Sequence, residues 1–129
     1  LLGPAMAGAG YIGIERKDPR KAVKSIALAV KRIKDGASVL IFPEGTRSVD
    51  GRLQSFKRGG FNLAFKSGCD IVPVVINGSN RIAKKGSLRI NKGSYSLHIE
   101  KPISLSDYRK KDIQRLMDNV HHAIAERLP

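Results

Sequence analysis

The chain has 129 residues, 41% of them hydrophobic, and carries 24 Lys and Arg against 11 Asp and Glu, a formal net charge of +13. This length suffices for one small domain with its own core, and the apolar content excludes a disordered chain. No apolar run approaches the roughly 20 residues of a membrane-spanning helix, and the single cysteine, Cys69, excludes an internal disulfide. The charge indicates an anionic partner, which could be nucleic acid, anionic lipid or a phosphorylated metabolite.

The first third of the chain predicts a strand, a helix and a second strand. Residues 11–16 have the composition of a short strand. Asp18 is a good N-cap and Pro19 a good first helical residue, and apolar residues then recur at helical spacing until Gly36. The apolar run that follows predicts a buried strand over residues 37–42, ended by Pro43.

A long loop is predicted next, over residues 43–55, and a loop of this length within a compact domain is usually functional. A helix is expected from Arg58 to Lys66, stopped by Gly68. A strand is expected over residues 71–76, where Pro73 favours an edge position or a bulge because proline cannot donate to a sheet ladder.

The last third predicts two strands and a helix. Residues 87–90 and 94–100 are expected to pair through a tight turn near Asn91-Lys92-Gly93. The final helix is indicated by an apolar stripe made of Ile113, Leu116, Met117, Val120 and Ile124. Alternating strands and helices predict an α/β class with helices covering a sheet, and residues 1–129 are expected to form a single domain.

The loop after the second strand carries the most informative residues, Phe42-Pro43-Glu44-Gly45-Thr46-Arg47-Ser48. The guanidinium of Arg47 offers a planar fork of donors that fits phosphate bidentately. Gly45 lets the backbone approach a ligand closely, and the Thr46 hydroxyl adds a further donor. These residue types in this order favour a phosphate-binding loop.

This segment resembles the third conserved block of the glycerolipid acyltransferases, a family that includes the 1-acylglycerol-3-phosphate and glycerol-3-phosphate acyltransferases. Residues 10–16, from Gly10 to Arg16, resemble the second block. Residues 56–60 resemble the stretch that follows the third block, and residues 71–76 resemble the fourth. The blocks stand in the family's order, and the resemblance covers roughly residues 5 to 105.

The resemblance implies a partial glycerol-3-phosphate acyltransferase-like sheet flanked by helices, and acyl transfer from a thioester to the hydroxyl of lysophosphatidate or a related glycerol phosphate. In this family an upstream His, separated by four residues from an Asp, acts as the general base. No such pair precedes Gly10. We therefore expect an N-terminally truncated acyltransferase domain that carries no catalytic residue and is inactive alone.

The resemblance also assigns roles to particular residues. It implies that Arg16 and Arg47 bind the phosphate of the acceptor, that Gly45 and Thr46 shape the loop, and that Lys57 contacts the same anion. Glu44 is expected either to orient Arg47 or to contact the glycerol hydroxyl. The substrate-binding residues that the resemblance implies are Arg16, Glu44, Gly45, Thr46, Arg47 and Lys57.

The implied partners follow from the same reaction. We expect an acyl-coenzyme A or acyl carrier protein thioester as co-substrate, and neither a cofactor nor a metal. The acceptor would be a glycerol phosphate or lysophospholipid. The protein would work at the cytoplasmic face of a membrane in phospholipid synthesis and would not bind nucleic acid.

Other interpretations remain open at this point. Glu44 and Arg47 could form a local surface salt bridge, and Arg16 could be a solvated strand end. Gly8-Ala9-Gly10-Tyr11-Ile12-Gly13 matches a dinucleotide-binding pattern, but Gly3-Pro4 interrupts the strand that this motif requires. A basic nucleic-acid-binding module and a non-catalytic domain that binds anionic lipid are the alternative functions.

Overall fold

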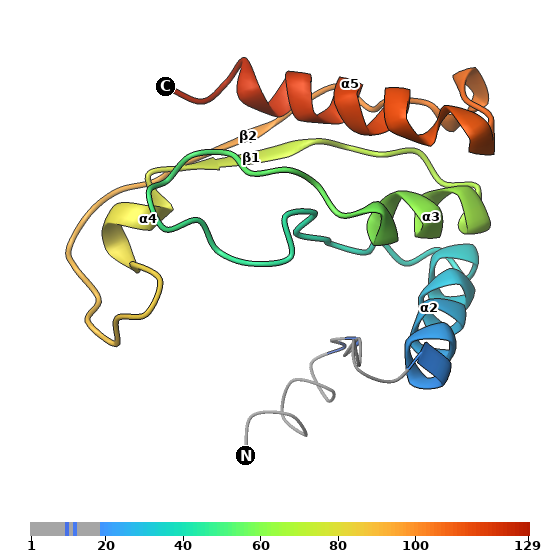
Figure 1. Ribbon diagram of the computed structural model, residues 1–129, viewed down its shortest axis with the longest axis horizontal. Helices are drawn as coiled ribbons and strands as arrows, with labels where there is room; N and C mark the ends of the chain where they lie inside the picture. Colours follow the sequence, from blue (N-terminus) through green and yellow to red (C-terminus); the bar gives the residue numbers. More distant parts are fainter. Residues whose placement is uncertain (1–9, 11, 13–18) are drawn as a thin grey trace. The chain divides into compact units, whose positions relative to one another are not determined.

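The computed structural model describes residues 10, 12 and 19–129, and the chain divides into two compact units, Leu1–Leu40 and Ile41–Pro129 (Figure 1). The strand expected over residues 11–16 lies outside the described residues, apart from Ile12. Each unit is described by itself. Among the described residues, no helix combines the length and the apolar character needed to cross a bilayer.

The described part of the first unit is dominated by helix α2, Pro19–Lys34, which begins at the predicted proline. Gly36 ends it with a φ of +96°, a backbone conformation that favours glycine. The N–H of Gly36 donates to Ile33 and that of Ala37 donates to Arg32, at 3.0 and 2.9 Å. This pair of bonds is a Schellman closure, which satisfies carbonyls that the helix end would leave unpaired.

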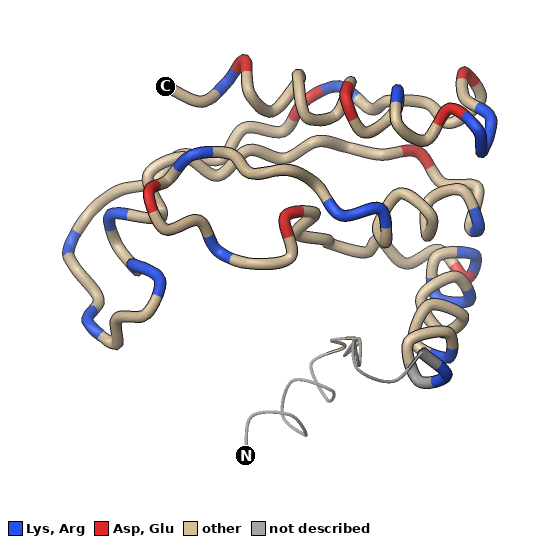
Figure 2. The backbone as a smooth tube through the Cα atoms, in the orientation of Figure 1, with Lys and Arg blue, Asp and Glu red and all other residues tan. Residues whose placement is uncertain are grey.

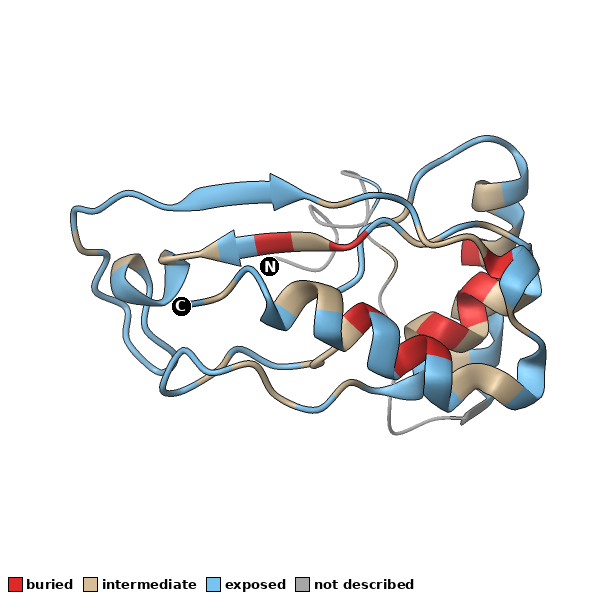
Figure 3. Cartoon of the chain, turned by 90° about the horizontal axis from the view of Figure 1, so that it is seen from above, coloured by how far each residue is buried: buried red, intermediate tan, exposed pale blue. Residues whose placement is uncertain are grey.

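The core of the second unit forms between helices α3, Arg58–Ser67, and α5, Ile113–Ala125. Figure 3 shows the buried positions concentrated on these two helices. Their apolar stripes face each other because both sequences place apolar residues at helical spacing. Both predicted helices are confirmed, and Gly68 ends α3 in the left-handed conformation, as expected. The buried cluster consists of Phe61, Ala64, Leu105, Leu116, Met117 and Val120.

A two-stranded antiparallel sheet joins β1, Val74–Asn77, to β2, Ser96–Ile99, with Val74 opposite Ile99 and Asn77 opposite Ser96. The predicted strand at 71–76 therefore begins only after Pro73, although an isolated bridge pairs Ile71 with Ile103. Because Pro73 has no N–H to donate, it interrupts the ladder there. Its carbonyl still accepts from the N–H of Glu100 at 3.0 Å. The α/β class is confirmed.

Short helical elements connect these parts. Helix α4, Ser79–Ile82, follows β1 directly, and its N-cap Gly78 has a φ of +89°. Two 3₁₀ turns, Leu105–Asp107 and Lys110–Asp112, lead from β2 towards α5. The hydroxyl of Ser104 accepts from the N–H of Ser106, which caps the first turn.

Two predicted strands are wrong. Residues 37–42 and 87–90 have no strand assignment, and Leu40, Phe42, Leu88 and Ile90 are all largely exposed. An apolar run becomes a strand only where a second strand pairs with its backbone, and neither segment has such a ladder partner within the described residues. The expected hairpin through residues 91–93 is therefore also wrong, since the partner of β2 is β1.

We predict that Leu116→Ala destabilises the protein far more than Leu88→Ala. Leu116 has no exposed surface, whereas Leu88 is fully exposed. Removing a buried leucine side chain leaves a cavity and costs about 2–5 kcal/mol, while a surface truncation changes stability by less than about 0.5 kcal/mol. Urea unfolding of both variants checks this difference. Equal midpoints for the two variants would show that α3 and α5 do not form the core.

Candidate functional site

The loop over residues 43–55 runs out to α4 and returns to the start of α3 (Figure 1). Its two sides are joined at the base, where the N–H of Lys57 donates to the Pro43 carbonyl at 2.7 Å. The carboxylate of Glu44 accepts from the N–H of Gln54 at 3.1 Å. Since both bonds cross the mouth of the loop, they fix the backbone on either side of it.

Glycine makes the contact between the loop base and α3 possible. An added Cβ at Gly60 would lie 3.1 Å from the Cγ2 atom of Ile41, closer than ordinary van der Waals contact. A larger residue at this position would therefore push the first turn of α3 away from the segment that enters the loop. The entry to the loop and the N-terminus of α3 thus lie side by side.

The segment that carries Arg47 starts with a tight turn. The N–H of Gly45 donates to the carbonyl of Phe42 at 3.0 Å, and Gly45 has a φ of +73°. Thr46 and Arg47 follow this turn and are exposed. Within the described part of the chain, the Arg47 guanidinium forms neither a hydrogen bond nor an ion pair. Its donors are therefore available to an external anion.

The far end of the loop is held by its own side chains. The hydroxyl of Ser48 donates to Asp50 at 3.0 Å and accepts from the N–H of Gly51 at 2.8 Å. The N–H of Arg52, with help from the Ser48 hydroxyl, stabilises the carboxylate and lowers the pKa of Asp50. Gly51, with a φ of +83°, lies against the Asn80 side chain of α4, where any Cβ would collide. The loop tip therefore lies directly against α4.

The return side of the loop ends at the N-terminus of α3. Lys57 occupies the N-cap position with extended backbone and provides no side-chain cap. The first turn contains no acidic residue, and Lys57 and Arg58 are both exposed. The free N–H groups at a helix start and the positive end of its dipole attract anions. The exposed Lys57 side chain adds positive charge at this start.

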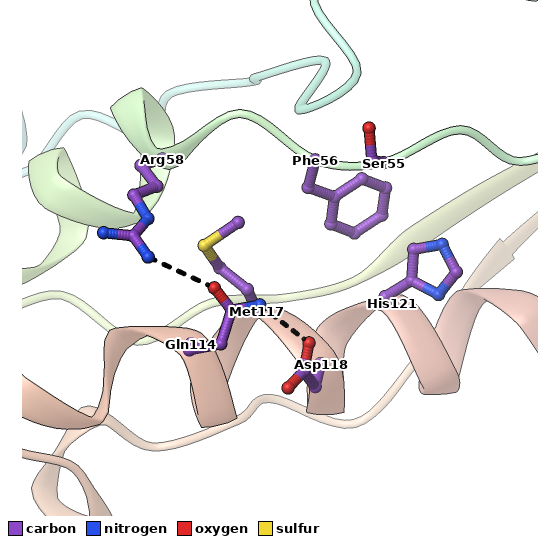
Figure 4. A pocket seen from close by; sticks show the side chains of 7 residues that line it. All are labelled: Ser55, Phe56, Arg58, Gln114, Met117, Asp118 and His121. Carbon is purple, nitrogen blue, oxygen red and sulfur yellow. Dashed lines mark hydrogen bonds between the residues drawn. The ribbon is translucent and has the colours of Figure 1, made fainter.

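A hollow of about 380 Å³ lies between the return side of the loop and α5 (Figure 4). Arg58 points across it and donates to the Gln114 side chain at 3.3 Å, and Gln114 donates in turn to Asp118 at 3.0 Å. The rings of Phe56 and His121 contact each other at a tilt of 57°, with their centroids 4.9 Å apart. This network connects the start of α3 with α5 and draws the Arg58 guanidinium towards α5.

The structure places four of the six predicted residues, Glu44, Gly45, Thr46 and Arg47, in one loop and a fifth, Lys57, at the base of that loop. Arg16 lies outside the described residues. Glu44 contacts the Gln54 backbone, and no ion pair joins it to Arg47 among the described residues. Sequence reasoning missed the closing roles of Gln54 and Gln114, since neither residue type signals its partner from sequence alone.

Comparison with known proteins gives consistent matches. A family model described as Acyltransferase matches residues 1–77. The chain is 42% identical over 127 residues to the chloroplastic 1-acyl-sn-glycerol-3-phosphate acyltransferase BAT2 of Brassica napus, covering 98% of this chain and 36% of that protein. It is 44% identical over 104 residues to the corresponding chloroplastic enzyme LPAT1 of Arabidopsis thaliana, covering 80% and 29%.

A solved structure agrees with these matches. The crystal structure of the 1-acyl-sn-glycerophosphate acyltransferase PlsC from Thermotoga maritima superimposes with a TM-score of 0.75 at 30% identity, covering 82% of this chain and 43% of that one. This likeness confirms the predicted fold class. The chain spans less than half the length of each of these three proteins.

The geometry of the loop base predicts that Glu44→Ala frees the Gln54 amide. A hydrogen bond to a charged acceptor contributes about 1.5–3 kcal/mol, so amide exchange at Gln54 should accelerate by about tenfold or more. Hydrogen exchange followed by NMR measures it. Glu126→Ala is the matched control, since Glu126 is exposed and its carboxylate pairs with His122 on α5, away from the loop. Unchanged protection of Gln54 in Glu44→Ala would contradict the closing role of Glu44.

Proposed function

Because this chain belongs to the acyltransferase family, we propose that the protein containing it moves an acyl chain from a thioester to the free hydroxyl of 1-acylglycerol 3-phosphate. The support comes from relatives that carry this activity in their names and from the phosphate-binding character of the loop. The alternatives, a nucleic-acid-binding module and a non-catalytic lipid-binding domain, receive no support from these comparisons.

The reaction exchanges one acyl bond for another. The acceptor hydroxyl attacks the thioester carbonyl, an ester bond forms, the C–S bond breaks, and the proton of the hydroxyl passes through a general base to the leaving thiol. By the family resemblance, this base is a His with an Asp five positions after it. None of the three histidines of this sequence is followed by such an Asp. We therefore assign to this chain the binding of the acceptor.

The observation that carries the proposal is the state of Arg47. Its backbone follows a closed turn, the loop base is held by Glu44 and Lys57, and its guanidinium is exposed and has no partner in the described chain. A fixed backbone with a free guanidinium reduces the ordering cost of gripping a phosphate. Thr46 adds a hydroxyl donor beside it, and Lys57 adds charge at the helix start.

The remaining partners of the proposal follow from the reaction class. The donor would be a coenzyme A or acyl carrier protein thioester, and the chemistry needs no further cofactor. Because a lysophospholipid acceptor lies in a bilayer, the protein would work at a membrane surface, on its cytoplasmic face. Fractionation with protease protection of sealed vesicles tests this location, and a lumenal location would overturn it.

In the protein that contains this chain, Arg47→Ala should lower kcat/KM for the phosphorylated acceptor by about 10–100-fold or more. Two charge-assisted hydrogen bonds, each worth roughly 1.5–3 kcal/mol, are at stake. Arg47→Lys should rescue poorly, because a point charge cannot reproduce the bidentate fork. The KM of the acyl donor should change much less. Steady-state kinetics with both substrates measures these parameters.

Arg52→Ala is the matched control for Arg47→Ala. It removes an exposed arginine from the same loop, but Arg52 already pairs with Asp50 at 3.7 Å. We expect unchanged acceptor kinetics in this control, and an unchanged melting temperature in both variants. If Arg47→Ala left acceptor kinetics unchanged, or if Arg52→Ala reduced them equally, the loop would not be the phosphate site.

The 129-residue chain alone should transfer no acyl group. General-base assistance contributes about 10²–10⁴-fold, and the sequence lacks the His and Asp that would supply it. A thioester-cleavage assay with lysophosphatidate and acyl-coenzyme A compares the chain with a complete relative. Turnover close to that of the relative would place the general base within this chain.

A further inference from the structure

A stretch of 29 residues, 71–99, contains no acidic side chain between Asp70 and Glu100. Its basic residues gather in the part that connects β1 to β2, and Figure 2 shows this connection with basic positions and no acidic ones. All 11 acidic residues of the chain lie outside this stretch, so its charged side chains are positive. The basic residues are Arg81, Lys84, Lys85, Arg89 and Lys92.

The centre of this connection is a closed loop over residues 82–91, here called the basic loop. The N–H of Asn91 donates to the Ile82 carbonyl at 2.9 Å, and the Asn91 side-chain amide donates to the Arg81 carbonyl at 3.2 Å. Ile82 also packs against Gly93, where an added Cβ would lie 3.1 Å from the Ile82 side chain. The ends of the basic loop are therefore joined like those of a compact Ω-type loop.

The tip of the basic loop has its own internal bonds. The N–H of Ser87 donates to the Lys84 carbonyl at 3.2 Å, and the N–H of Arg89 donates to the Ser87 hydroxyl at 3.0 Å. Gly86 has a φ of +81°, which the turn between Lys85 and Ser87 requires. The side chains of the tip are thus presented by a defined backbone.

Two large aliphatic side chains extend from this tip into solvent. Leu88 is 103% exposed and Ile90 is 79% exposed, so neither packs on the second unit. Almost every residue of the connection between α4 and β2 is exposed (Figure 3). Arg89 lies between the two aliphatic residues, Lys84 and Lys85 precede them, and all three cationic side chains are exposed. Exposed aliphatic residues among cations fit a partner that is anionic at its surface and apolar beneath it.

We propose that the basic loop docks on an anionic lipid bilayer. Leu88 and Ile90 enter the interface between headgroups and acyl chains, while Lys84, Lys85 and Arg89 contact lipid phosphates. This inference goes beyond acyl transfer, because it assigns membrane contact to a segment outside the loop over residues 43–55. It rests on the proposed function only in that the acceptor of that reaction lies in a bilayer.

The chemistry of the tip distinguishes a bilayer from nucleic acid. Binding to single strands uses aromatic side chains on which bases stack, and the basic loop contains no aromatic residue. Aliphatic side chains gain nothing from a phosphate backbone but gain free energy when they leave water for lipid. Charge complementarity and the aliphatic tip therefore favour the bilayer.

Vesicle binding by the protein that contains this chain tests the charge component. Each Lys or Arg near an anionic surface strengthens binding by about fivefold. The triple variant Lys84→Gln, Lys85→Gln, Arg89→Gln should therefore lose on the order of 100-fold in partitioning onto phosphatidylglycerol-containing vesicles. The control Lys101→Gln, Lys110→Gln, Lys111→Gln removes the same charge from exposed positions outside the loop. It should retain most of the binding.

A fluorescence measurement tests insertion of the tip. This sequence contains no tryptophan, so Leu88→Trp adds one fluorophore whose signal is obtained by subtracting the spectrum of the unmodified protein. We expect a blue shift on anionic vesicles and quenching by brominated acyl chains. Leu88→Ser should weaken binding by about tenfold, because it removes most of the apolar contact. Neutral phosphatidylcholine vesicles should give neither the shift nor the quenching.

Several results would overturn the proposal. Equal losses in the two triple variants would show that diffuse net charge drives binding. An unshifted emission spectrum of the Leu88→Trp variant on anionic vesicles would show that the tip stays in water or lies beneath another part of the protein. Tighter binding to an RNA oligonucleotide than to vesicles would indicate a different partner, and a change of oligomeric state in Leu88→Ser would indicate contact with a second copy.

The same variants separate this proposal from the acyl-transfer proposal. With a short-chain, water-soluble lysophosphatidate, the basic-loop triple variant should keep the unmodified activity, while activity on acceptor embedded in vesicles should fall. If the protein transferred no acyl chain at all, vesicle binding and the fluorescence of the Leu88→Trp variant would still test the docking surface. Reduced activity on the soluble acceptor would instead place the basic loop in the acceptor site.

Discussion

The contact between α3 and α5 fixes the rest of the second unit. Leu116 and Phe61 are buried at its centre, and Lys57, at the N-terminus of α3, donates its N–H to Pro43 at the entry of the loop over residues 43–55. Phe56 extends this contact, because its ring packs against both Phe61 and His121. Since a well-packed core transmits strain, the position of the loop is set by the core between α3 and α5. Loss of that core would displace the loop without any change in the loop sequence.

The helices of this protein were predictable because their signals are local. Pro19 and Gly68 mark a start and an end by their own backbone preferences, and the stripe from Ile113 to Ile124 defines the buried face of α5. A strand has no such independence, because its hydrogen bonds belong to a partner distant in sequence. Residues 37–42 and 87–90 have the composition of strands and lack the partner in the described structure. The pairing of β1 with β2 was hidden for the same reason, since local turn signals favoured a nearer partner.

The same contrast between local and long-range signals applies to the candidate site. Four of the expected site residues are consecutive, Glu44 to Arg47, so residue type and order were enough to select them. The closure of the loop was not predictable, because Gln54 contributes its backbone N–H to Glu44 and any residue type except proline has that donor. Glu44, expected either to orient Arg47 or to contact the glycerol hydroxyl, accepts a hydrogen bond from the N–H of Gln54, ten residues further along the chain.

Three arginines in or next to the loop have the same charge but differ in whether another group of the protein already binds their guanidinium. Arg52 pairs with Asp50, and Arg58 donates to Gln114, so part of the donor capacity of each is satisfied within the protein. Arg47 has the same charge, but its fork has no partner in the described chain. A phosphate that approached Arg52 or Arg58 would have to compete with an existing contact, whereas at Arg47 it would replace only water. The net charge of +13 attracts anions to the whole surface, and under the proposed function the free fork of Arg47 would add the selectivity that diffuse charge lacks.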